Sequence, residues 1–209
     1  MFTLTPNEER LFKSLSTPAK IQDFLNTVPF NYEHDGIDTW RSPRRVLRDQ
    51  KAHCVEGALF AAAVLWYHGH KPLIMGFCTA PKDQDHFVAL YKTNGYWGAI
   101  SKTNHAILRF RDPVYKTPRE LAMSHFHEYY MFEDGTKTLR SYSAPVNLSR
   151  FGKGWVTTEE ELFHLVDAVN DAPHVDMIPK ENRRKLRKAD PIELTAGKLL
   201  EWQKNNPRT

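Results

Sequence analysis

Hydrophobic residues recur at helical spacing between residues 55 and 66 and outline one long helix. Alanines also fill the remaining faces, so this helix is apolar nearly all round, and we expect it at the centre of the fold. Gly69 and Pro72 follow where a C-terminal cap and a stop belong. The apolar stripe consists of Val55, Ala58, Leu59, Ala62, Leu65 and Trp66.

The chain after this helix changes to short runs rich in β-branched and aromatic residues, which predict strands. Asn94-Gly95 is a strong hairpin signal, because both residues tolerate a positive φ. We therefore expect an antiparallel sheet packed on the central helix. Its predicted strands are residues 73–78, 86–91, 96–101 and 105–110.

Helices are predicted on both sides of this centre from Thr-Pro, Asp-Pro and Thr-Thr capping signals. The order of helices, sheet and helices predicts an α+β fold in one domain, 1–209, with its core at about 21–112 and a helical C-terminal extension at about 117–209. The flanking helices are expected to begin near residues 5 and 17, to pass through Val46 and Leu47, and to run from 117 to about 131, from 157 through 169, and from 190 to about 204, with a strand at 138–146.

The composition is that of a globular protein, with 41% hydrophobic and 26% charged residues in a chain of 209. Its apolar runs are shorter than the ~20 residues of a membrane helix, and its N-terminus lacks the basic and apolar regions of a signal peptide. Two cysteines are too few for a disulfide scaffold and suit a reducing compartment. We expect a cytoplasmic protein that does not associate with membranes.

The formal net charge of +4 is uneven, because six lysines and arginines fall within residues 180–188. Such a run is able to track phosphates. No aromatic residue interleaves with it, however, and no nucleic-acid motif surrounds it. We interpret the run as a solvated connecting segment and do not expect a nucleic-acid partner.

Cys54 directly precedes the helical stripe, so it is predicted at the helix N-terminus. Unpaired N–H groups and the positive end of the helix dipole stabilise a thiolate there. The alternative is a buried, inert cysteine beside an apolar helix.

His86 begins the second predicted strand, on the face of Val88 and Leu90. A histidine there is often a core or ion-pair residue, but a Cys at a helix start followed by a His at a strand start is the order that a folded Cys–His pair needs. His53 competes for the role of base. Neighbours along a chain rarely point at each other, so we favour His86.

The region between residues 21 and 112 resembles the bacterial transglutaminase-like (papain-related) cysteine superfamily. In that family a loop with Trp and Pro leads to a nucleophilic Cys on a helix, followed by a His and then an Asp on the next strands. The residues that carry the resemblance are Tyr32, Trp40-Arg-Ser-Pro43, His53-Cys54-Val-Glu-Gly-Ala58, Gly69-His-Lys-Pro72, Asp85-His86-Phe-Val-Ala and Gly95-Tyr-Trp97.

The third member of the site departs from the family pattern. Ser101 stands where the family has an Asp, four residues after Trp97. An uncharged serine orients an imidazole more weakly than a carboxylate does. Asn104 is a second candidate, as Asn serves in papain-like enzymes, and Asp112 is a third if an insertion intervenes. These three alternatives stay open.

The resemblance implies a thiol enzyme that acts on amide bonds, as a peptidase, amidase or acyltransferase. Cys54 attacks the carbonyl of a peptide, protein or small amide, His86 carries the proton, and the Cys54 N–H is an oxyanion donor. The missing Asp supports an alternative, an inactive protein of the same fold that binds a peptide or protein partner. No cofactor is implied, and Cys54, Cys78, His53 and His86 lack the spacing of a metal site.

Overall fold

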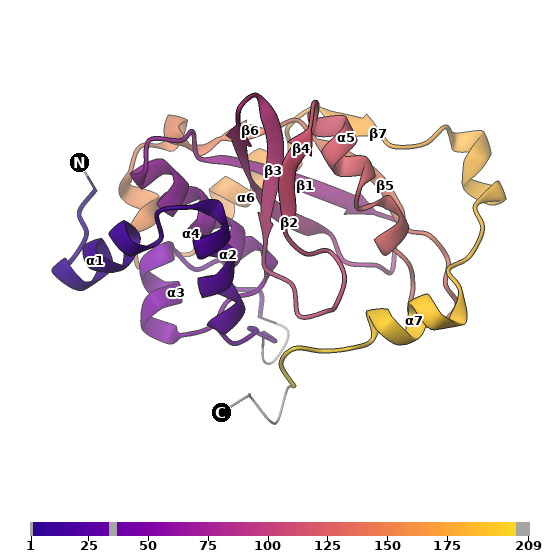
Figure 1. The fold of residues 1–209 in the computed structure, drawn as a ribbon, viewed down its shortest axis with the longest axis horizontal. Helices are drawn as coiled ribbons and strands as arrows, with labels where there is room; N and C mark the ends of the chain where they lie inside the picture. Colours follow the sequence, from indigo (N-terminus) through magenta and orange to yellow (C-terminus); the bar gives the residue numbers. More distant parts are fainter. Residues whose placement is uncertain (1, 34–36, 204–209) are drawn as a thin grey trace.

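The computed structural model describes residues 2–33 and 37–203, and at its centre lies an antiparallel sheet with the strand order β4-β3-β2-β1-β5-β7 (Figure 1). A further short strand, β6, pairs with β1. This architecture confirms the predicted α+β class. The strands are β1 (Leu73–Thr79), β2 (His86–Thr93), β3 (Tyr96–Ser101), β4 (Arg111–Tyr115), β5 (Leu139–Ser143), β6 (Val146–Asn147) and β7 (His174–Asp176).

Most helices begin where the sequence places a capping residue before a proline. Thr5, Thr17, Ser42 and Thr117 each accept a hydrogen bond from a backbone N–H in the first turn of the helix that follows. The helices are α1 (Pro6–Ser14), α2 (Pro18–Thr27), α3 (Pro43–Asp49), α4 (Cys54–Tyr67), α5 (Pro118–Met123), α6 (Phe163–Asn170) and α7 (Pro191–Gly197), with 3-10 turns η2 (Phe126–Glu128), η3 (Leu148–Phe151), η4 (Gly154–Val156) and η5 (Lys180–Lys185).

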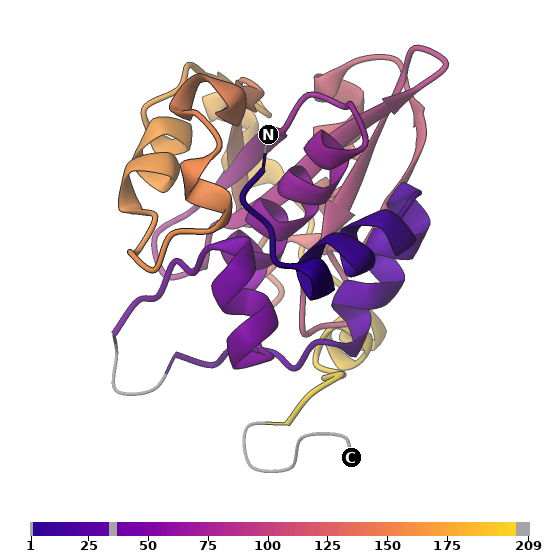
Figure 2. The same cartoon turned by 90° about the vertical axis from the view of Figure 1, so that its left-hand side faces the viewer.

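The sheet is covered on both faces, so β2 buries alternate residues in two different layers. Phe87 and Ala89 pack with α4 and with apolar residues of α1, α2 and α6. Val88 and Leu90 face the opposite way, into a second cluster with α5. Figure 2 shows α4 between the N-terminal helices and the segment that carries α6. The helix α4 is central, as predicted, and Ala58 to Ala63 are at most 1% exposed.

The hairpin between β2 and β3 turns at the predicted residues. Asn94 and Gly95 both have positive φ values, 50° and 86°, which is the geometry that this pair of residues adopts at low cost.

Residues 105–110 do not form the predicted strand, and β4 begins only at Arg111. Leu108 adopts a left-handed φ of 59°, which is incompatible with an extended strand. Its N–H donates to the Glu128 carboxylate at 2.6 Å, so tertiary contacts replace the ladder that the apolar pattern suggested.

The segment expected as a helical extension adds strands to the same sheet, because β5 and β6 pair with β1 and β7 pairs with β5. The predicted strand at 138–146 is split into β5 and β6, and α5 ends at Met123 rather than near 131. The next helix, α6, begins only at Phe163. The last helix ends at Gly197, and residue 204, its predicted end, lies outside the described residues.

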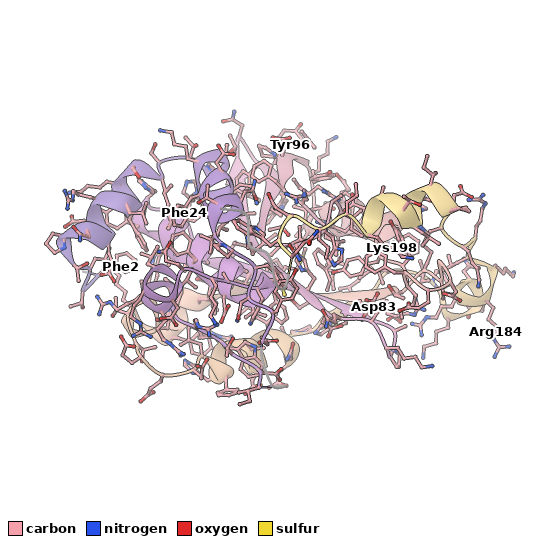
Figure 3. The ribbon with its side chains drawn as sticks, turned by 90° about the horizontal axis from the view of Figure 1, so that it is seen from below. Phe2, Phe24, Asp83, Tyr96, Arg184 and Lys198 are labelled. Atoms are coloured by element: carbon pink, nitrogen blue, oxygen red, sulfur yellow. The ribbon has the colours of Figure 1, made fainter. Side chains whose placement is uncertain are left out.

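The lysine- and arginine-rich run at residues 180–188 forms η5 and the loop that follows it. It lies at the end of the molecule opposite Phe2 in the view of Figure 3, where Arg184 is labelled. Three of its cations pair within the chain: Arg183 with Asp176, Arg187 with Asp190, and Lys188 with Asp134. None of the helices within 2–33 and 37–203 is both long and apolar enough to span a bilayer.

Candidate active site

Cys54 is the first residue of α4, with His53 as its N-cap. The helix starts here because His53 has an extended conformation and the Glu56 carboxylate accepts the His53 N–H at 3.0 Å. Within the described part of the chain, the Cys54 N–H has no hydrogen-bond acceptor. The thiol therefore sits beside a free N–H at the positive end of the helix dipole.

The Cys54 thiol is only partly exposed, and its surroundings favour the ionised form. Burial alone would raise the pKa of Cys54, but hydrogen bonding and charge from His53 and His86 outweigh burial and lower the pKa to about 5. The two histidines therefore favour the thiolate form of this sulfur over the neutral thiol.

His86 is the first residue of β2 and is buried against Ser101 at the end of β3. Its Nε2 lies 2.7 Å from the Ser101 hydroxyl, and that hydroxyl lies 2.5 Å from the Leu108 carbonyl oxygen. Because the serine proton must go to the carbonyl, the hydroxyl accepts from Nε2–H. The other ring nitrogen of His86, Nδ1, takes no part in this contact.

The Ser101 backbone is fixed by Gln22 on α2, a residue that sequence reasoning missed. The Gln22 amide accepts from the Ser101 N–H at 2.9 Å and donates to the Ser101 carbonyl at 2.8 Å. Gln22 lies on the buried face of α2 among Ile21 and Leu25, and a polar residue on an apolar helical face was the signal available. These two hydrogen bonds fix the Ser101 backbone, and with it the position of the hydroxyl that contacts His86.

The other two candidates for the third position lie elsewhere. Asn104 exchanges hydrogen bonds with the Trp202 backbone, at 2.9 Å to the carbonyl and 2.8 Å from the N–H. Asp112 is exposed on β4. Of the predicted residues, the structure brings together Cys54, His86 and Ser101, and it leaves Asn104 and Asp112 out.

His53 has both ring nitrogens engaged. Its Nε2 lies 2.5 Å from the Thr39 carbonyl oxygen and 3.2 Å from a Glu33 carboxylate oxygen, and its Nδ1 accepts the Val55 N–H at 3.2 Å. Burial lowers the pKa of His53, but Cys54, Glu33 and Glu56 outweigh burial and raise the pKa to about 11.

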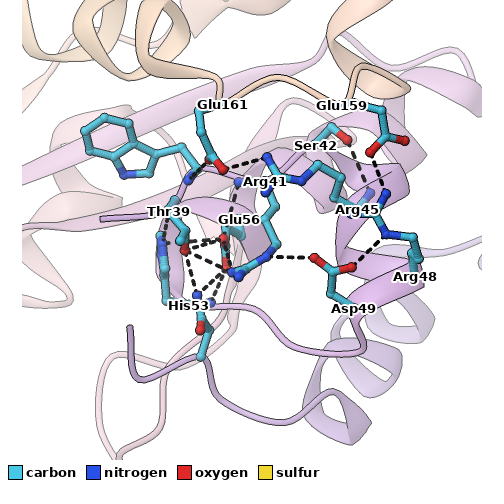
Figure 4. Close-up of polar contacts among 12 residues, drawn as sticks. Thr39, Arg41, Ser42, Arg45, Arg48, Asp49, His53, Glu56, Glu159 and Glu161 are labelled. Atoms are coloured by element: carbon cyan, nitrogen blue, oxygen red, sulfur yellow. Dashed lines mark hydrogen bonds and ion pairs between the residues drawn. The ribbon is translucent and has the colours of Figure 1, made fainter. Parts of the chain in front are cut away.

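Beneath this cap lies a buried ionic network that the sequence analysis did not identify (Figure 4). Glu56 is 0% exposed and accepts from the side chains of Arg41 at 2.8 Å and Thr39 at 2.9 Å, and from the backbone N–H of His53. Arg41 also pairs with Asp49 at 3.0 Å. The network ties the loop before α3 to the first turn of α4. A Glu two residues after Cys54, at the capping-box position, was the visible sign of it.

The second cysteine, Cys78, has a different environment. Its sulfur lies 3.6 Å from Nδ1 of His174, and burial raises the pKa of its thiol. Cys78 therefore remains a thiol at neutral pH and serves as an internal reference for Cys54. Within the described ranges, no three His, Cys, Asp or Glu side chains are grouped as metal ligands would be.

No protein-family model matches the chain, and no curated protein matches it. Among solved structures, the chain is similar to LapG of Legionella pneumophila. The calcium-bound form is 20% identical over 44% of this chain, with a TM-score of 0.37. The EGTA-treated form is 14% identical over 69% of this chain and 80% of that chain (TM-score 0.44), and a further LapG structure is 13% identical over 77% and 82% (TM-score 0.43).

The chain spans 59% of the calcium-bound LapG chain, less than two thirds of its length. At these TM-scores the likeness assigns neither residues nor an activity.

Proposed function

We propose that the chain is a transglutaminase-like thiol enzyme that acts on amide bonds, as a peptidase, amidase or acyltransferase. The observation that carries this proposal is the Cys54 thiol at the start of α4, with its pKa lowered to about 5 beside His86. A thiolate at neutral pH is the nucleophile of acyl transfer, and a structural cysteine has no need of one.

In the proposed reaction, the Cys54 thiolate forms a C–S bond to the substrate carbonyl carbon. The C–N bond then breaks, and His86 delivers a proton to the leaving amine. The free Cys54 N–H donates to the oxyanion that develops on the carbonyl oxygen. Water or a second amine attacks the thioester and returns the thiolate.

Ser101 sets a limit on this chemistry, because its hydroxyl orients the His86 ring without a charge to stabilise an imidazolium. The same feature supports the second candidate function, an inactive protein of this fold that binds a peptide or protein partner. The two proposals differ in what becomes of an acyl group offered to Cys54.

The test uses p-nitrophenyl acetate as acyl donor and iodoacetamide as alkylating agent, with both cysteines followed by mass spectrometry. For the enzyme we expect acetylation of Cys54 with release of nitrophenolate, and alkylation of Cys54 that rises with pH around 5. Cys54→Ser removes both signals, His86→Ala removes turnover, and Cys78→Ser, the matched control, changes neither. Alkylation of Cys54 only above about pH 8.5, the range of an ordinary thiol, would exclude the enzyme and favour the binding protein.

A further inference from the structure

Leu108 lies in the loop between β3 and β4, and both of its polar backbone groups bind side chains. Its carbonyl oxygen accepts from the Ser101 hydroxyl at 2.5 Å, and its N–H donates to the Glu128 carboxylate at 2.6 Å. Its left-handed φ of 59° is a conformation that non-glycine residues rarely adopt and that persists where surrounding contacts impose it. Glu128 is placed to impose it.

We propose that Glu128 is a positioning residue for His86 and acts through Leu108 and Ser101. This inference rests on the proposed function above, in which His86 carries the proton. Glu128 holds the Leu108 turn, and the Leu108 carbonyl oxygen takes the Ser101 proton. The hydroxyl oxygen is then left to accept from Nε2–H of His86 at 2.7 Å.

The Glu128 carboxylate is itself held by Arg111, the first residue of β4. One carboxylate oxygen accepts from the Arg111 guanidinium at 2.5 Å, and the other accepts the Leu108 N–H. The guanidinium also donates to the Ser124 hydroxyl at 3.0 Å, and the Arg111 carbonyl oxygen accepts from the Tyr91 hydroxyl at 3.1 Å. Arg111 is thus tied to β2 and to the end of α5, so the carboxylate that binds Leu108 has a fixed support.

The alternative is that this ion pair only stabilises the fold. The pair is partly buried, with side-chain exposures of 13% for Arg111 and 31% for Glu128, so its loss lowers stability in either case. The two roles differ in how their effects on rate combine. Residues that act as one unit on a reacting group have non-additive effects, while the effects of independent changes multiply.

The experiment is a double-mutant cycle on the turnover of p-nitrophenyl acetate by the full chain, followed by nitrophenolate release. It compares Glu128→Ala, Ser101→Ala and the double variant with the wild type, and His86→Ala gives the background rate. Glu128→Gln is a second variant for the same cycle, which keeps the size of the side chain if Glu128→Ala does not fold. Circular dichroism melts identify the folded variants.

Glu8→Ala is the matched control. The Glu8 carboxylate also binds both an arginine and a backbone N–H, because it pairs with Arg44 at 2.8 Å and accepts the Thr5 N–H at 2.7 Å. Glu8 lies on α1 and Arg44 on α3. The control therefore removes an ion pair of the same kind without touching Leu108 or Ser101.

We expect Glu128→Ala to lower the turnover rate about tenfold, less than the roughly hundredfold that misplacing a catalytic group by about 1 Å can cost. In the Ser101→Ala background the same substitution should change the rate by less than about twofold, because the hydroxyl through which Glu128 acts is gone. Glu128→Gln should follow the same pattern with a smaller loss, since its one amide oxygen must serve both Leu108 and Arg111. Glu8→Ala should leave the rate unchanged.

An unchanged rate in a folded Glu128 variant, an equal loss in the presence and absence of Ser101, or an equal loss in Glu8→Ala overturns this inference and leaves the proposed function standing. A wild type that does not turn over the ester, with Cys54 alkylated only above about pH 8.5, overturns the proposed function and this inference with it. The two failures are therefore distinct.

Discussion

At the scale of a single residue, the Ser101 hydroxyl connects the His86 ring to the Leu108 carbonyl oxygen. It accepts from His86 only because it donates its own proton to the Leu108 carbonyl oxygen. An aspartate at this position would bring two acceptors together, its carboxylate and that carbonyl. The serine hydroxyl therefore suits a position next to the Leu108 carbonyl oxygen, and the two groups together orient the His86 ring.

Replacing Ser101 with Ala should slow turnover at Cys54 because the His86 ring loses its acceptor. A hydrogen bond to a charged group contributes about 1.5–3 kcal/mol, which corresponds to about a ten- to hundredfold lower rate of nitrophenolate release. Ser143→Ala is the control, because Ser143 is also fully buried in the sheet but accepts from the Gly76 N–H. An unchanged rate in Ser101→Ala alone would mean that another group orients His86.

At the scale of an element, the first turn of α4 carries Cys54, and the hydrogen bonds and ion pairs of the buried Glu56 carboxylate hold this turn in place. Glu56 is held by Arg41, Thr39 and the His53 N–H. Burying a charge is tolerated only when it is paired and hydrogen-bonded. The carboxylate meets both conditions, and it fixes the direction in which Cys54 and its N–H point.

Substituting Glu56 with Gln should therefore destabilise the fold strongly, since it removes the fully buried one of the two carboxylates that pair with Arg41 and leaves Asp49 as its remaining partner. We expect a loss of about 3–5 kcal/mol in the free energy of unfolding, measured by urea denaturation. Glu159→Gln provides the comparison, because its ion pair with Arg48 is more than half exposed and should change the same quantity by less than about 1 kcal/mol. Equal effects of the two substitutions would contradict this account of the network.

At the scale of the whole molecule, the C-terminal segment is tied to the loop that follows Ser101. The Glu201 N–H donates to the Asn104 carbonyl oxygen at 2.8 Å. The Asn104 side-chain amide donates to the Trp202 carbonyl oxygen and accepts from the Trp202 N–H. The Lys102 ammonium lies 5.9 Å from the centroid of the Trp202 ring. The end of the chain thus buttresses the segment on which the orientation of His86 depends.

Truncating Trp202 to Ala should weaken the fold through lost burial, because this side chain is only 7% exposed. The expected loss is about 3–5 kcal/mol in the free energy of unfolding. Leu200→Ala in the same segment is the control, with 42% exposure and an expected loss within about 1 kcal/mol. Chemical denaturation followed by circular dichroism measures both, and a neutral Trp202→Ala would show that the segment is dispensable for stability.

Local signals in the sequence were sufficient for several elements of this protein. The Thr-Pro and Asp-Pro caps marked the starts of helices, Asn94-Gly95 marked the hairpin, and the apolar stripe after Cys54 marked the central helix, because each depends on backbone preferences within a few residues. The position of Cys54 at a helix start followed from the same stripe.

Tertiary structure decided everything that depends on which distant side chains meet. Ser101 rather than Asn104 contacts His86 because Gln22 on α2 fixes the Ser101 backbone, 79 residues away along the chain. Strands β5 to β7 joined the sheet because β1 offered a free edge, which no local pattern near residue 140 encodes. The contact of Glu33 with His53 likewise needed a loop folded back on α4. Hydrophobic periodicity predicts where an element lies, and only the packed chain determines which polar groups share a site.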